Sequence, residues 1–204
     1  VPTLSQGEHS LTTTVTSPAG NVSAPSAAID FTVDTTAPAE PTGLLLVNDE
    51  VDPAVPVASG GATNDTTPVL SGSTEPDSVV IVRDNGVIIG SATAGNDGSW
   101  RFTPDTALEA GSHSLTASVT DPAGNVGPES APYTFTVDLT PPAAPVDVVL
   151  SNNDGSTLVA IAANGATNDT TPQLSGSATA GSIITVYDGD STTPIGSVTV
   201  GADG

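Results

Sequence analysis

The sequence predicts an all-β protein built from tandem β-sandwiches, and three observations predict it. The chain of 204 residues has 21 Gly, 18 Pro and only 3% aromatic residues, a composition that disfavours helices and suits short strands joined by turns. Polar and apolar side chains alternate in several segments, as in strands with one buried face. Whole blocks of sequence also recur at a fixed spacing, which is the pattern of a repeat protein.

The repeat has a period of 104 residues. Residues 61–73 (GATNDTTPVLSGS) recur as residues 165–177 (GATNDTTPQLSGS), and 165 − 61 = 104. Residues 31–34 (FTVD) recur as residues 135–138, and 138 − 34 = 104. Separate blocks that share one offset indicate tandem copies of a single structural unit.

The period sets the domain organisation. We expect one complete repeat over residues 35–138, the last third of a preceding repeat over residues 1–34, and the first two thirds of a following repeat over residues 139–204. A two-residue insertion near residues 190–194 raises the later offset to 106, since Gly95 matches Gly201. We therefore expect the natural protein to continue in both directions.

Seven short strands are expected within residues 35–138. They cover residues 43–47, 68–73, 78–83, 87–92, 99–103, 112–120 and 133–137. In the sixth strand Leu115, Ala117 and Val119 face one way while polar residues face the other. The tripeptide 84–86 (DNG) predicts a hairpin turn, and Trp100 fits as a core anchor. Seven strands in about 100 residues, with Greek-key spacing, are typical of an immunoglobulin-like sandwich, here without disulfides because the chain has no Cys.

The charge balance excludes several classes of partner. Two basic residues, Arg83 and Arg101, face 23 acidic ones, so the net charge is 2 − 23 = −21. Such a surface repels nucleic acid and anionic lipid. No run approaches the ~20 apolar residues of a membrane span, so we expect no membrane insertion. The lack of Cys excludes zinc–thiolate, iron–sulfur and cysteine-nucleophile sites.

Four motifs resemble those of a known family. They are residues 33–38 (VDTTAP), 64–72 (NDTTPVLSG), 98–104 (GSWRFTP) and 121–125 (DPAGN). As a set they resemble the bacterial Ig-like repeats of giant, type I-secreted, biofilm-type surface adhesins. This resemblance implies an extracellular or cell-surface stalk of tandem sandwiches, often stiffened by calcium at the domain junctions.

Strand direction places the acidic loops at the two ends of the sandwich. Calcium takes six to eight oxygen ligands, and carboxylates, carbonyls and water supply them. The loops at each end bring such oxygens toward the neighbouring repeat. The candidate ligands are Asp34, Glu75, Asp77, Asp97, Asp121 and Asn125 at the first junction, and Asp65 and Asp138 at the second.

Structural alternatives stand beside the ligand hypothesis. Asp121 and Asn125 can cap a turn through bonds to the backbone, and residues 64–67 can satisfy the backbone at a strand start. Asp34 and Asp138 recur at the repeat boundary, which favours ligation. Three further residues, Asp84, Asp188 and Asp190, are expected to serve only in hairpins.

The predicted function is a structural spacer in a large extracellular adhesin that supports cell adhesion or biofilm formation. Its expected partners are neighbouring repeats of the same chain, and a host or matrix surface reached through regions outside this sequence. Two alternatives remain: glycan or protein binding by the variable loop over residues 48–58, and an extracellular filament in which a strand of one molecule completes the next. Catalysis is not expected. His9 and His113 share one repeat position, in phase with inward Leu side chains at a strand end, and a structural role is expected for both rather than a role as a base.

Overall fold

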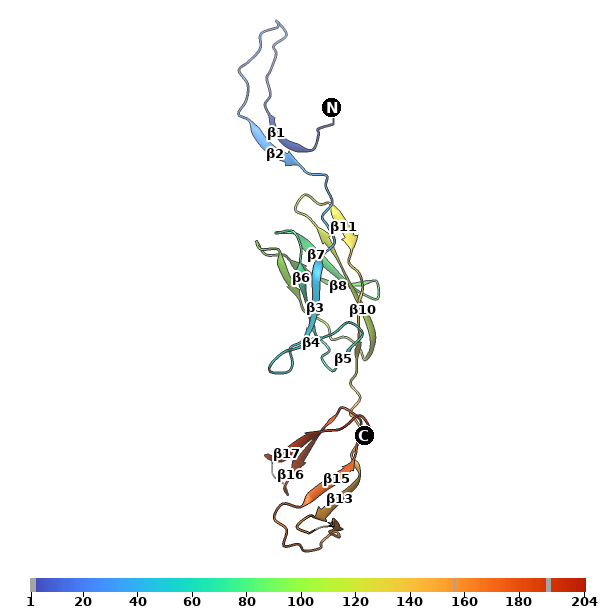
Figure 1. The fold of residues 1–204 in the computed structure, drawn as a ribbon. Coiled ribbons are helices and arrows are strands. Elements are labelled where there is room, and N and C mark those ends of the chain that lie inside the picture. Colours follow the sequence, from blue (N-terminus) through green and yellow to red (C-terminus); the bar gives the residue numbers. More distant parts are fainter. Residues whose placement is uncertain (1–2, 156, 190–191) are drawn as a thin grey trace. The chain divides into compact units, whose positions relative to one another are not determined.

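A computed structural model describes residues 3–155, 157–189 and 192–204. Every regular element in these ranges is a strand, so the all-β prediction is confirmed (Figure 1). The chain divides into two compact units, residues 1–139 and 140–204. The predicted repeat boundary at residue 34 remains a prediction, and the predicted insertion near residues 190–194 lies partly outside the described residues.

The first unit begins with a two-stranded hairpin. Strand β1 (Gly7–Leu11) pairs antiparallel with β2 (Ile29–Val33), and His9 lies opposite Phe31. The rings of these two residues stack with centroids 5.6 Å apart. We call this element the N-terminal hairpin.

Residues 35–138, the central repeat, form a sandwich of two sheets. The four-stranded sheet has the order β4 (Val55–Val57), β3 (Thr42–Asn48), β6 (Val69–Ser73), β9 (Ser99–Phe102). The six-stranded sheet has the order β5 (Ala62–Thr63), β12 (Tyr133–Val137), β10 (Gly111–Thr120), β7 (Val79–Asp84), β8 (Val87–Thr93), with β11 (Val126–Glu129) also paired to β10. The chain crosses between the sheets from β6 to β7 and from β9 to β10, as in an immunoglobulin-like sandwich.

All seven strands expected from the sequence are present, and three more were missed. Strands β4 and β5 fall between the expected strands 43–47 and 68–73, and β11 falls between the expected strands 112–120 and 133–137. These three segments show no alternation of polar and apolar residues that would predict a strand. Strand β4 has a Pro at its centre, and β5 has only two residues, which pair in parallel with β12.

The core lies between the two sheets. Leu115, Ala117 and Val119 of β10 are at most 1% exposed, which confirms their predicted inward face. Leu70 of β6 is fully buried and Trp100 of β9 is 2% exposed. Burying a side chain of this size stabilises a fold by about 1.5–3 kcal/mol, so a few such anchors hold a small sandwich together without disulfides.

A glycine turn joins two loops at one end of the sandwich. Gly98 has φ of 78°, a conformation that glycine adopts without steric cost. Its carbonyl accepts the N–H of Thr74 at 2.9 Å, and a Cβ on Gly98 would overlap the Thr74 carbonyl. The loops that hold Glu75 and Asp97 are therefore tied side by side.

The second unit repeats the strand pairing of the central repeat. Its strands are β13 (Val146–Asn152), β14 (Val159–Ala160), β15 (Gln173–Ser177), β16 (Ile183–Tyr187) and β17 (Pro194–Thr199). Leu150 pairs with Leu174, which is the pairing of Leu46 with Leu70 moved by 104 residues. The register therefore follows the sequence repeat. Among the described residues of the chain, no helix is long and apolar enough to cross a membrane.

Candidate metal site at the repeat junctions

Asp121 follows β10 and closes the turn that leads into β11. Its Oδ1 accepts the main-chain N–H of Asn125 at 2.8 Å, and its Oδ2 accepts the Asn125 side-chain amide at 2.8 Å. Asp121 as a whole is 7% exposed. The Asn125 amide holds the pKa of Asp121 below its ordinary value, against the opposing effects of burial and of the nearby Asp34 charge. The turn-capping role considered from the sequence is present in the structure.

Asn125 also reaches the end of the N-terminal hairpin. Its Nδ2 donates to the main-chain carbonyl of Asp34 at 3.1 Å. Asp34, Asp121 and Asn125 are thus brought together across the start of the linker, as the sequence predicted. We call these three residues the junction triad.

The side chain of Asp34 is held on the hairpin side of this triad. Its Oδ1 accepts the main-chain N–H of Thr36 and the Nε2 of Gln6, both at 3.0 Å. The Gln6 Oε1 in turn accepts the N–H and the hydroxyl of Thr35, each at 2.7 Å. The Thr36 N–H and the Gln6 amide hold the pKa of Asp34 below its ordinary value. Gln6 was missed by the sequence analysis, although pairing of Gly7 with Val33 places it beside Asp34.

The other three candidates at this junction do not join the triad. Asp97 Oδ1 accepts the Ser99 hydroxyl at 2.6 Å and the Ser99 N–H at 3.0 Å, and these bonds hold the pKa of Asp97 below its ordinary value. Asp77 has φ of 59° in an exposed turn, and Glu75 is exposed beside it. Within the described ranges, no three His, Cys, Asp or Glu side chains lie close enough to hold a metal ion. Ligation by all six residues together remains a prediction.

At the second junction Asp65 is buried and structural. Its side chain is fully buried, and its Oδ1 accepts the Thr67 N–H at 2.8 Å. Its Oδ2 accepts the Asp49 N–H at 3.3 Å, which ties the start of β6 to the end of β3. The second unit has the same arrangement around Asp169, 104 residues later, with bonds from Thr171 and Asn153. The repeated motif 64–67 thus satisfies backbone donors.

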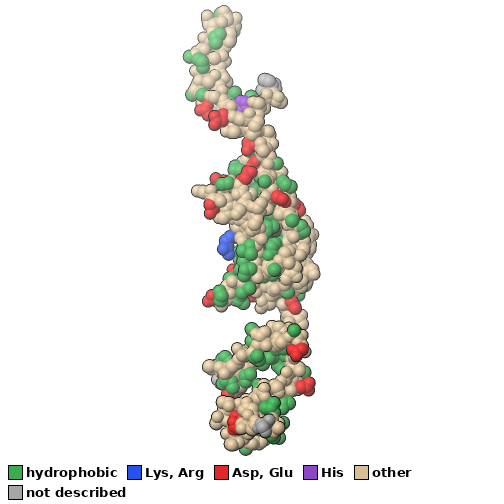
Figure 2. Space-filling model, viewed as in Figure 1, with side chains coloured by type: hydrophobic (Ala, Val, Ile, Leu, Met, Phe, Trp, Pro, Cys, Tyr) green, Lys and Arg blue, Asp and Glu red, His purple; other side chains and the backbone are tan. Residues whose placement is uncertain are grey.

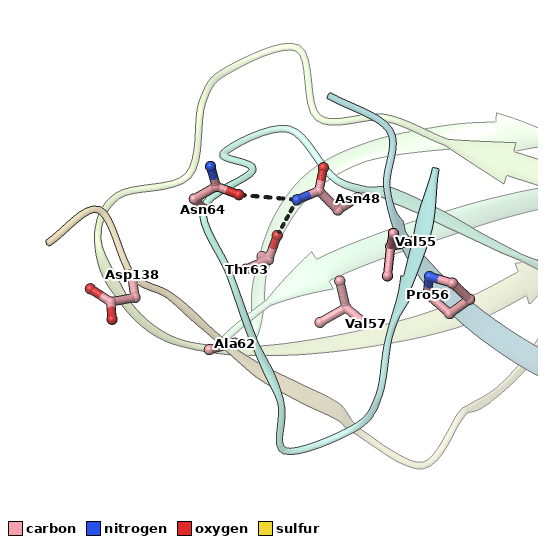
Figure 3. A pocket seen from close by; sticks show the side chains of 8 residues that line it. All are labelled: Asn48, Val55, Pro56, Val57, Ala62, Thr63, Asn64 and Asp138. Atoms are coloured by element: carbon pink, nitrogen blue, oxygen red, sulfur yellow. Dashed lines mark hydrogen bonds between the residues drawn. The ribbon is translucent and has the colours of Figure 1, made fainter. Parts of the chain in front are cut away.

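Asp138 leaves the sandwich beside this motif. Its main-chain N–H donates to the Thr63 carbonyl at 2.8 Å. Asn64 and Asp138 line a shallow pocket of about 330 Å³, in which Asn48 Nδ2 donates to Thr63 Oγ1 at 3.0 Å and to Asn64 Oδ1 at 3.1 Å. Figure 3 shows the Asp138 carboxylate turned away from Asn48 and Thr63. The backbones approach as expected, while metal binding by Asp65 and Asp138 remains a prediction.

The linker between the hairpin and the central sandwich is packed closely against the sandwich. Pro38 is buried, and a Cβ on Gly127 of β11 would overlap the Pro38 carbonyl oxygen. Only glycine allows the linker backbone to approach so near at this point. The contact fixes the linker against β11, and the sequence analysis missed it.

His113 is held by two acceptors. Its Nδ1 lies 2.7 Å from Asp84 Oδ2, and its Nε2 lies 2.8 Å from the Glu109 carbonyl. The ring stacks on Phe135 at 5.3 Å. Because a carboxylate and a carbonyl can only accept, the protonated imidazole is the form that satisfies both contacts. The expected structural role of His113 is confirmed, whereas Asp84 does more than turn a hairpin: its Oδ1 also accepts the Ser114 N–H.

This pair makes the stability of the central repeat depend on pH. Burial alone would lower the pKa of His113, but the bond to Asp84, the Glu109 carbonyl and the Asp84 charge together raise it. A raised folded pKa contributes stability that is fully present below the unfolded value of about 6.5 and is lost as pH rises through the folded value. Urea unfolding followed by Trp100 fluorescence should show the free energy of unfolding falling over that window. Asp84→Asn should flatten the dependence; an equal slope in both proteins would contradict the assignment.

Acidic side chains dominate the surface charge. On the face shown in Figure 2, Asp and Glu are spread over both units and one small basic patch is visible. Arg83 is tied to Glu129 at 3.1 Å and to the Ser118 hydroxyl at 3.0 Å. The negative charge of most carboxylates is therefore balanced by hydrogen bonds, water or dissolved cations.

Comparison with known proteins finds a family model that matches part of the chain. Residues 56–139 match the model of a family described as bacterial Ig-like domain. No curated protein matches the sequence. One matching solved structure, titled "Biofilm associated protein - BSP domain", is 25% identical with a TM-score of 0.33. That alignment covers 66% of this chain and 20% of the other, so the chain spans about a fifth of that protein's length.

Proposed function

Because residues 56–139 match the family model of a bacterial Ig-like domain, we propose that the chain is a series of spacer repeats in a large extracellular bacterial adhesin. The repeats add length between the cell surface and a distant adhesive region. Calcium at the junctions stiffens the series, and the chain itself carries out no catalysis. The matching solved structure described above is titled as a biofilm-associated protein, which agrees with an extracellular adhesin.

The junction triad carries the proposal. A spacer transmits orientation only if each repeat is fixed to the next. Here Asn125, in a loop of the central repeat, bonds both to Asp121 of its own repeat and to Asp34 at the end of the preceding hairpin. The buried linker at Pro38 adds a second contact to the same junction. These contacts support a stiff connection.

The same triad supports calcium as the junction ion. The carboxylate and carbonyl oxygens of the triad are the kind of ligand that calcium prefers. The negative charges of Asp34 and Asp121 repel each other, since the Asp34 charge raises the pKa of Asp121. A bound divalent cation would cancel that repulsion. The two carboxylates supply part of the six to eight ligands required, and main-chain carbonyls and water would supply the rest.

Calcium removal is therefore expected to loosen the chain and lower its melting temperature. An ion present at 100 times its dissociation constant stabilises the folded state by about 2.7 kcal/mol. Thermal unfolding and small-angle scattering, each with calcium and with a chelator, measure the two effects. Asp121→Asn should abolish them, while Asp105→Asn, at an exposed acidic site away from the triad, should leave them intact. Identical curves with and without calcium in the unaltered protein would refute the calcium role.

A further inference from the structure

The repeated motif before β6 holds an asparagine triplet that the spacer function leaves unexplained. Residues 64–66 (NDT) and their counterparts 168–170 (NDT) fit the pattern Asn-X-Ser/Thr with X other than Pro, and residues 21–23 (NVS) fit it too. This pattern is the acceptor of N-linked glycosylation in secreted chains, because the transferase reads the hydroxyl two residues after the asparagine. A motif this short also occurs by chance, so the surroundings of Asn64 must decide whether a sugar fits there.

The Asn64 amide has one end engaged and the other end free. Its Oδ1 accepts the Asn48 Nδ2 at 3.1 Å. Asn48 is fixed in turn, because its Oδ1 accepts the Glu50 N–H at 3.1 Å and its Nδ2 also donates to Thr63 Oγ1 at 3.0 Å. Asn48 therefore presents a donor, and Asn64 meets it with its oxygen. Among the residues that the structure describes, Asn64 Nδ2 has no acceptor, and Figure 3 shows it on the side away from Asn48.

The backbone holds Asn64 outward between two buried neighbours. Thr63 is 7% exposed and Asp65 is fully buried, whereas Asn64 is exposed. The Thr63 hydroxyl accepts the Asp65 N–H at 3.1 Å, and Asp65 Oδ1 accepts the Thr67 N–H at 2.8 Å. The flanking residues make these bonds, so a bulky group on Asn64 Nδ2 would leave them intact.

Two other asparagines of the central repeat each lack a part of this arrangement. Asn125 uses its Nδ2 in the junction triad, and Gly127 stands two residues after it. Asn96 is exposed and is also followed by Asp, but Gly98 stands where the triplet needs Ser or Thr. Asn64 has both the free amide nitrogen and the hydroxyl residue at the required spacing.

We propose that Asn64 is a site of N-glycosylation, in which a sugar activated as its diphosphate is transferred to the side-chain amide. A bond forms between Nδ2 and the anomeric carbon, and the bond from that carbon to the phosphate oxygen breaks with its electron pair. The amide loses one proton to a base of the transferase. The triplet at residues 168–170 gives the next copy of the motif an acceptor at the same position. Such sugars add neutral, hydrated bulk to an acidic surface, and calcium plays no part in their attachment.

The folded loop indicates when the sugar is added. A transferase needs the whole triplet exposed, but in the folded repeat Asp65 is fully buried and Thr66 is half-buried. The Thr66 carbonyl also accepts the Leu108 N–H at 2.8 Å. Transfer therefore precedes folding, and the repeat must then fold with the sugar in place. The outward Nδ2 of Asn64 allows this.

Mass spectrometry of peptides from the protein isolated from the cells that make it tests the proposal. The peptide with Asn64 should carry the mass of one or more sugar residues, located on Asn64 by fragmentation, and the peptide with Asn96 should carry none. Single sugars added stepwise identify a nucleoside diphosphate donor, whereas one preassembled block identifies a lipid-linked donor. An Asn64 peptide of unmodified mass overturns the proposal.

Replacing Thr66 separates the triplet from the asparagine alone. Thr66→Ala should abolish the sugar on Asn64, and Thr66→Ser, which keeps the hydroxyl, should retain it. The fluorescence of Trp100 shows whether both variants fold. A sugar that remains on Asn64 in Thr66→Ala contradicts the assignment of the triplet as the acceptor.

A sugar attached chemically tests whether the folded repeat has room for it. Because the chain has no Cys, Asn64→Cys and Asn48→Cys can each be labelled in urea with a glucosyl iodoacetamide and then refolded. The labelled Asn64→Cys chain should melt at the same temperature as the same chain labelled with plain iodoacetamide. The labelled Asn48→Cys chain should melt lower or fail to fold, because Asn48 is 7% exposed. An Asn64→Cys chain that fails to refold only with the glucosyl label overturns the proposal.

Discussion

Replacing Asp65 by alanine is expected to lower the free energy of unfolding of the central repeat by about 2–4 kcal/mol, because each hydrogen bond to a buried charged group contributes about 1.5–3 kcal/mol. The fully buried carboxylate accepts the N–H groups of Thr67 and Asp49. Alanine leaves both donors without this acceptor and also creates a small cavity. Urea unfolding followed by the fluorescence of Trp100, the single Trp of the chain, measures the loss.

The control for Asp65 is its neighbour Asp49. The side chain of Asp49 is exposed, and its contribution to this motif is its main-chain N–H. Asp49→Ala should therefore change stability by less than about 0.5 kcal/mol. The Asp65→Ala loss should be the same in calcium and in chelator if Asp65 acts only on the backbone. A loss seen only in calcium would instead identify Asp65 as a metal ligand.

Replacing Gly127 by alanine is expected to displace the linker and to lower the free energy of unfolding of the first unit. The added Cβ would overlap the Pro38 carbonyl, which is backbone and cannot rotate away. Overpacking of this kind typically costs about 1–3 kcal/mol. Amide exchange of residues 35–41 should become faster, because the linker no longer packs on β11.

Gly196 provides the control for Gly127. A Cβ on Gly196 of β17 would meet nothing within 4 Å. Gly196→Ala should leave both the stability and the linker exchange of the first unit unchanged. If amide exchange of residues 35–41 stays as slow in Gly127→Ala as in the unaltered protein, the prediction is wrong and other contacts hold Pro38.

The strands with regular alternation could be predicted from the sequence, and the irregular ones could not. Strand β10 shows its buried face in the spacing of Leu115, Ala117 and Val119. Strand β11 has a Gly and a Pro at its centre, and it pairs with β10 through a register shift. Its position depends on the Pro38 contact and on Arg83, which comes from another strand. Such pairing is tertiary, and no local pattern encodes it.

The candidate site divides in the same way. The approach of Asp34 to Asp121 and Asn125 followed from strand direction, because a strand that exits one repeat must meet the loops at the start of the next. The orientation of a carboxylate does not follow from direction. Asp65 turns inward because unpaired N–H groups of the backbone lie within its reach. Asp84 was assigned only to a hairpin, since nothing in its own segment indicates that His113 of the neighbouring strand β10 lies beside it.

The orientation of the N-terminal hairpin relative to the central repeat tests the account most directly. Spin labels on Ser10→Cys and Thr106→Cys, both exposed sites in a chain without natural Cys, allow pulsed electron resonance to measure the distance distribution across the junction triad. We expect one narrow distribution in calcium, which broadens on chelation and broadens further in Asp121→Asn. A distribution that is equally broad in calcium, in chelator and in the variant would show that the junction does not hold successive repeats in place.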